Sequence, residues 1–145
     1  MREYRKRWTH NWAELDHFSA LPNDLSMATT EVGRVVAMNP SKTIIDLAGL
    51  NDTDLALKGF SADRFFANHA PDLLYMPHPH YQGMRDKILH SPTFRSRYAL
   101  YTSISLQSRF GVAIRKDSEY FEQMKIILER RLQKVKSSHK NAGKP

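Results

Sequence analysis

The residues best suited to chemistry lie in two polar segments, each at the C-terminal end of a predicted strand. The first segment covers residues 46–52 and contains Asp46, Asn51 and Asp52 around a glycine. Their oxygen atoms could bind sugar hydroxyls or a divalent cation, and α/β folds bind ligands at the carboxyl ends of strands. The alternative is a glycine turn whose polar side chains cap the next helix. The segment has neither the spacing of an EF-hand nor a dinucleotide- or phosphate-binding glycine motif.

The second segment, residues 76–81, alternates proline with histidine and ends in tyrosine. His78 and His80 could face one metal ion, but a site needs a third ligand, and nothing in the sequence places one nearby. Tyr81 could instead stack on a sugar ring. An ordinary exposed loop is the third interpretation. We expect no metal and no cofactor here.

Glu31 follows the first predicted strand and could pair with Asp46, as two carboxylates do in glycoside hydrolases. Two acids at neighbouring strand ends are common, however, and the chain has no nucleophile elbow and no cysteine. We therefore expect no catalytic residue in this chain. The candidate ligand-binding residues are Glu31, Asp46, Asn51, Asp52, His78, His80 and Tyr81.

The elements that must position these side chains follow from periodicity and turn residues. Residues 8–20 form an amphipathic helix, and Ser61 and Ser91 are predicted helix N-caps. The expected order is helix, strand, strand, helix, strand, helix, strand, strand, helix, with strands at 25–30, 43–47, 71–76, 98–105 and 109–115 and a last helix at 117–136. This order predicts a small three-layer-like α/β domain, with a mainly parallel sheet, a C-terminal antiparallel hairpin and a long C-terminal helix.

Composition limits the class of protein. The 145 residues suit one domain, and a hydrophobic fraction of 41% excludes wholesale disorder. We expect a single domain over residues 1–136 and a disordered basic tail over 137–145. No apolar run approaches the roughly 20 residues that span a bilayer. The N-terminal region is too polar for a signal peptide, so we expect the chain itself to be soluble.

The net charge of +7 is concentrated at the two ends of the chain. Residues 1–7 carry +3 and residues 125–145 carry +6, which leaves −2 for the remainder. The simplest interpretation is a solvated helix end and tail, and the lack of aromatic residues in the C-terminal basic run argues against nucleic acid. A stand-alone basic module for nucleic acid or an anionic membrane surface is the alternative.

Three short stretches resemble the extracytoplasmic C-terminal region of polytopic membrane glycosyltransferases that use polyprenyl-phosphate sugars, such as mannosyl- and arabinosyltransferases. The similarity covers roughly residues 21–116. The block of highest specificity is the Gly-Leu-Asn-Asp sequence at 49–52. The matching positions are Glu31 and Gly33, then Ile45, Asp46, Gly49, Leu50, Asn51 and Asp52, then Pro71 and Asp72.

The resemblance implies a small α/β domain that packs on a bundle of membrane helices at the extracytoplasmic face. In that family the catalytic acid lies on a loop of the membrane part, and nothing in this chain matches that loop. The domain would therefore assist binding of a glycan acceptor or a lipid-linked sugar without catalysing transfer alone. Its partner would be the membrane-embedded part of the parent protein. The oligomeric state does not follow from the sequence.

Overall fold

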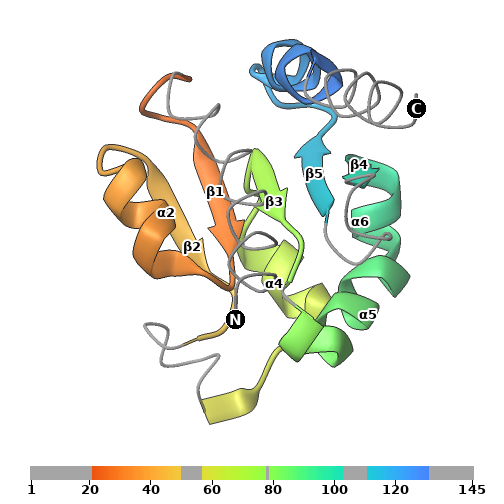
Figure 1. The fold of residues 1–145 in the computed structure, drawn as a ribbon. Helices are drawn as coiled ribbons and strands as arrows, with labels where there is room; N and C mark the ends of the chain where they lie inside the picture. The colour runs from red at the N-terminus through yellow and green to blue at the C-terminus, as the bar shows by residue number, and fades with distance from the viewer. Residues whose placement is uncertain (1–20, 50–56, 78, 103–110, 131–145) are drawn as a thin grey trace, which may run out of the picture.

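The structure, a computed structural model, describes residues 21–49, 57–77, 79–102 and 111–130. Its elements are short strands and short helices (Figure 1). In chain order they are β1 (Ser26–Thr29), α2 (Val32–Met38), β2 (Thr43–Asp46), α4 (Ala62–Asn68), β3 (Leu73–Tyr75), η1 (Pro79–Tyr81), α5 (Gln82–His90), α6 (Pro92–Arg97), β4 (Tyr98–Thr102) and β5 (Gly111–Arg115). Residues 121–130, here called the C-terminal helix, follow β5.

The strands form one five-stranded sheet in the order β2-β1-β3-β5-β4. β1 pairs in parallel with both β2 and β3, whereas β5 pairs antiparallel with both β3 and β4. The α/β class is therefore confirmed, but the sheet is mixed rather than mainly parallel, with two pairings of each kind. The connection between β4 and β5 lies outside the described residues, so the predicted hairpin is seen only as its two paired strands.

Two apolar cores cover the two faces of the sheet. Alternate strand residues point to opposite faces, so Leu73 joins one core and Leu74 joins the other. The first core also takes Val35 of α2 and Met124 of the C-terminal helix. The second is built with residues of α4, α5 and α6. Because both faces are covered, β3 and β5 read as nearly continuous apolar runs.

Helix α2 corrects the expected element order, which placed no helix between the first two strands. Parallel neighbours need a crossover connection, and α2 supplies it between β1 and β2. Its sequence is a poor helix former, because it contains Gly33 and three valines. Burial of Val35, which is fully inaccessible to solvent, compensates for that weakness.

The predicted N-caps and one boundary can be compared with the structure. The Ser61 and Ser91 hydroxyls accept the backbone N–H groups three residues on, at the starts of α4 and α6, which confirms both caps. The C-terminal helix begins at residue 121, not at Asp117 as predicted. The residues before it form turns, where Asp117 and Ser118 bind partners on other elements. The predicted helix at 8–20 and the tail at 137–145 lie outside the described residues.

Candidate functional site

The carboxyl ends of β1, β2 and β3 lie at one edge of the sheet, because these three strands are mutually parallel. From β1 the chain passes through α2 to β2 on one side of β1, and from β2 it passes through α4 to β3 on the other side of β1. The connection after β1 therefore runs to one side of the sheet and the connection after the adjacent strand β3, through α5 and α6 to β4, runs to the other side. Such a change of direction between neighbouring strands opens a crevice at the strand ends, where open α/β sheets bind ligands. We call the residues that follow these three strands the carboxyl edge.

Glu31 lies at this edge, immediately before α2. Its backbone N–H donates a 3.0 Å hydrogen bond to Thr29 Oγ1, which fixes the turn that leaves β1. Burial raises the pKa of the half-buried Glu31 carboxyl, and the charge of His80 opposes that rise. The fold therefore brings the first candidate residue within electrostatic reach of the segment after β3, although 49 positions separate them in the chain.

Asp46 closes β2 and is buried, with 8% of its surface exposed. Its Oδ1 accepts the Ala48 N–H at 2.9 Å, and Gly49 follows with a positive φ of 74°. A left-handed backbone of this kind favours glycine. The turn of the alternative interpretation of residues 46–52 is therefore present, with Asp46 forming an Asx-type turn, whereas the expected cap on the next helix falls on residues outside the described part of the chain. The Asp46 carboxylate therefore stabilises the loop that leaves β2.

The remaining candidate residues divide into two groups. His80 is exposed and Tyr81 is half-buried, in the one-turn helix η1 that precedes α5. Asn51, Asp52 and His78 lie outside the described residues. Within the described part of the chain, no group of three histidine, aspartate or glutamate side chains could hold a metal ion.

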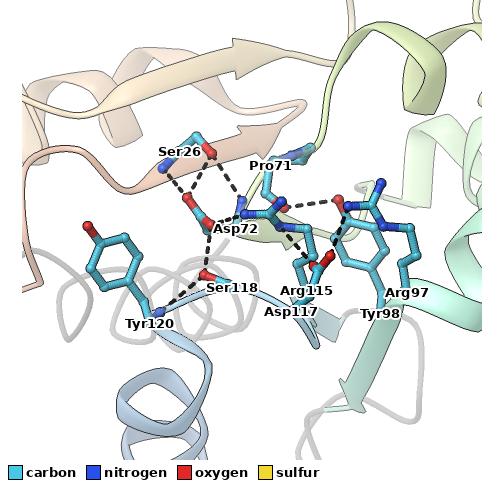
Figure 2. Close-up of polar contacts among 9 residues, drawn as sticks. All are labelled: Ser26, Pro71, Asp72, Arg97, Tyr98, Arg115, Asp117, Ser118 and Tyr120. Atoms are coloured by element: carbon cyan, nitrogen blue, oxygen red, sulfur yellow. Dashed lines mark hydrogen bonds and ion pairs between the residues drawn. The ribbon is translucent and has the colours of Figure 1, made fainter.

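A second polar cluster surrounds Asp72 at the opposite end of β3 (Figure 2). Its Oδ2 accepts hydrogen bonds from the Ser26 N–H and hydroxyl, both at 2.9 Å. Its Oδ1 accepts the Ser118 hydroxyl and the Arg115 guanidinium, both at 2.7 Å. The cluster therefore ties the start of β1, the start of β3 and the end of β5 together.

The electrostatics of this cluster suit a permanently ionised carboxylate. Burial by itself would raise the pKa of Asp72, but the hydrogen bonds from Ser26, Ser118 and Arg115 outweigh it and hold the pKa below its ordinary value. Arg115 also lies near Asp117, which in turn pairs with Arg97 at 3.2 Å. The donors to Asp72 described here are thus groups of the protein itself, and the role of the cluster is to hold strands β1, β3 and β5 together.

Sequence reasoning did not find this cluster. Asp72 entered only as one position of the family resemblance, and its partners lie more than 40 positions away on either side. No spacing between neighbouring residues in the sequence predicts a cluster of partners so far apart. A weak signal exists in the position of Asp72, because an acid directly before a wholly apolar strand must find partners once the strand is buried.

Comparison of the chain with models of protein families, with curated proteins and with solved structures finds no match. In the described part of the chain, no helix has the length and apolar character needed to cross a membrane.

Proposed function

We propose that the chain is a non-catalytic accessory domain of a glycosyltransferase-like membrane protein, and that its carboxyl edge binds part of a glycan or lipid-linked sugar. The observation that carries the proposal is that half-buried Glu31 and the η1 residues His80 and Tyr81 follow two adjacent parallel strands, β1 and β3, at the same end of the sheet. It agrees with the resemblance of residues 21–116 to the extracytoplasmic region of such enzymes. The parent protein's membrane part would be the partner of this domain.

The chemistry of the edge supports binding of polyhydroxylated ligands. A partly buried carboxylate is a strong acceptor for hydroxyl donors, and hydrogen bonds to charged groups contribute about 1.5–3 kcal/mol each. Imidazole can donate to a hydroxyl or a phosphate oxygen, and the ring of Tyr81 offers a face for a sugar. The pair of Glu31 and His80 would therefore select a ligand that presents both a hydroxyl and an anionic group.

Amide NMR of the isotope-labelled chain tests this proposal. The probes are a short-chain prenyl phosphomannose and a free oligomannoside. We expect the phosphomannose to shift amides of Thr30 to Val32 and of His80 to Gln82, and the oligomannoside to shift fewer of them. Glu31→Gln should weaken binding by roughly 10- to 100-fold, as the loss of one charge-assisted hydrogen bond implies.

The matched control is Glu122→Gln, which neutralises an exposed acid on the C-terminal helix. This variant should bind both probes as the parent chain does. Equal loss in the two variants would show that the net charge, not the site, controls binding. If neither probe at millimolar concentration shifts any amide of the carboxyl edge, the ligand part of the proposal is wrong.

The membrane part of the proposal has its own test, which is the native gene upstream of the Met1 codon. We expect an open reading frame that encodes several apolar segments of spanning length. A stop codon followed by a ribosome-binding site directly before Met1 would contradict it, whatever the NMR titration shows.

A further inference from the structure

The helical layer formed by α4, α5 and α6 with its flanking turns is strongly basic. The neighbouring residue Lys116 belongs to it, because its Nζ donates to carbonyl oxygens of α6. Against the acids Asp63, Asp86 and Asp117, this layer carries the basic residues Lys58, Arg64, Arg85, Lys87, Arg95, Arg97 and Lys116. On the other face, the C-terminal helix and its leading turn have three acids and two basic residues over positions 119–130. The described fold is therefore electrically one-sided.

Contacts to backbone carbonyls hold several of these cations in place. Lys87 Nζ donates to the Phe60 carbonyl at 3.2 Å, and Arg95 Nε donates to the Leu89 carbonyl at 2.9 Å. Lys116 Nζ donates to the Ser96 carbonyl at 3.0 Å. A carbonyl contact orders the side chain without cancelling its charge, so the layer presents positioned positive charges to its surroundings.

An apolar side chain projects beside this charge. Leu57 is 78% exposed, the highest value among the large hydrophobic residues of the described chain. It lies three positions before Phe60, whose carbonyl holds Lys87. The adjacent Lys58 is also exposed. An exposed leucine in a basic segment suits a surface that rests in the headgroup region of a bilayer, where the apolar group enters and the cations meet phosphates.

We propose that the α4–α5–α6 layer docks on an anionic lipid bilayer surface. The described contacts favour lipid over nucleic acid, because the aromatic rings of this layer are turned inward. Phe65, Phe66 and Phe94 are buried in the second core, which leaves them no face on which bases could stack. This docking uses a surface other than the carboxyl edge and does not depend on sugar binding there.

Vesicle co-sedimentation of the full chain tests the docking. Vesicles of phosphatidylcholine alone are compared with vesicles that also contain phosphatidylglycerol, at low and high salt. The test variant combines Lys87→Gln and Arg95→Gln. The control variant combines Lys125→Gln and Arg130→Gln on the C-terminal helix, so that each variant loses two positive charges. Each basic residue at an anionic surface contributes about fivefold, so the first variant should bind about 25-fold more weakly. The second should change less than about threefold, because its charges lie on the other face.

Two further variants separate docking from folding. Lys87→Arg with Arg95→Lys keeps the charge and should bind as the parent does, while circular dichroism melts check that each variant is folded. Leu57→Ser should weaken binding several-fold, and Ile126→Ser, on the C-terminal helix and 46% exposed in the parent, should not. Equal losses in the two charge-neutralised variants would overturn the proposal, because vesicle binding would then follow the net charge of the chain and not the α4–α5–α6 layer. The proposal would also be overturned, in favour of nucleic acid, if the variant Lys87→Gln with Arg95→Gln lost binding to single-stranded RNA while its vesicle binding stayed unchanged.

Discussion

Replacement of Asp72 by asparagine should destabilise the fold by about 3 kcal/mol. Two donors meet each carboxylate oxygen, from Ser26 on one and from Ser118 and Arg115 on the other. Asparagine has one oxygen and one NH₂ group. In either orientation of its amide, the NH₂ group faces two of the hydrogen-bond donors that met the carboxylate, so two hydrogen bonds are lost. Breaking a buried charge pair costs about 3–5 kcal/mol. We take the lower value because 22% of the Arg115 side chain is exposed and water can reach it.

Urea denaturation followed by circular dichroism measures this loss, with the slope of the transition held in common. A loss of about 3 kcal/mol should lower the melting temperature by roughly 10 °C. The control is Asp63→Asn on the exposed first turn of α4, which should stay within about 0.5 kcal/mol of the parent. Ser118→Ala should cost about 1 kcal/mol, and less when Asp72 is already asparagine.

The pH dependence gives the same carboxylate a distinct signature. Its pKa in the folded chain lies below the ordinary value of 3.8, so the folded state binds its proton less readily than the unfolded state. The stabilisation is therefore complete above about pH 5 and is lost as the pH falls through the folded-state pKa. The difference in unfolding free energy between the parent chain and the Asp72→Asn variant should therefore become smaller below about pH 4. A loss under 1 kcal/mol at pH 7, or a difference that is unchanged at acid pH, would refute the assignment.

Four other substitutions have definite expected outcomes. Tyr98→Phe leaves the buried Pro71 carbonyl without its 2.9 Å donor and should cost about 1–2 kcal/mol in urea denaturation; no loss would mean that water replaces the hydroxyl. Gly111→Ala places a Cβ 3.0 Å from a backbone oxygen of β4 and should cost about 1–3 kcal/mol. Gly83→Ala, which has open space in α5, should instead stabilise the chain by about 0.5–1 kcal/mol. Glu31→Gln should raise the melting temperature at pH 7 and not at pH 4, because burial raises the folded-state pKa of Glu31 and its charged form opposes folding; equal shifts at both pH values would contradict this.

Local features of the sequence were enough to predict much of the fold. The β-branched run from Thr43 fits β2, and the serine caps at 61 and 91 start α4 and α6 as expected. These features act through neighbouring residues, so a single sequence contains them. Helix α2 was missed because its stability depends on Val35 packing against the sheet, which no window of sequence describes.

Features that depend on pairing across the chain could not be predicted. The position of β5 between β3 and β4 decides how much of the sheet is parallel, and turn residues alone would place β4 beside β3. The approach of Glu31 to His80 requires the order β2-β1-β3, which is likewise non-local. For Asp46, the ligand-binding and the turn interpretations differ in the partner of one carboxylate oxygen. In the structure Asp46 Oδ1 accepts the Ala48 N–H, as the turn interpretation expects.

The interior position of β5 also bears on how the chain folds during synthesis. β3 is made about 36 positions before β5, and until β5 arrives one edge of β3 has no partner in the sheet. An apolar strand with an open edge is a template for pairing with other chains. The donors from Arg115 and Ser118 reach Asp72 only at that same late stage. Ribosomal pausing before residue 118 should therefore lengthen the interval in which the nascent chain needs a chaperone.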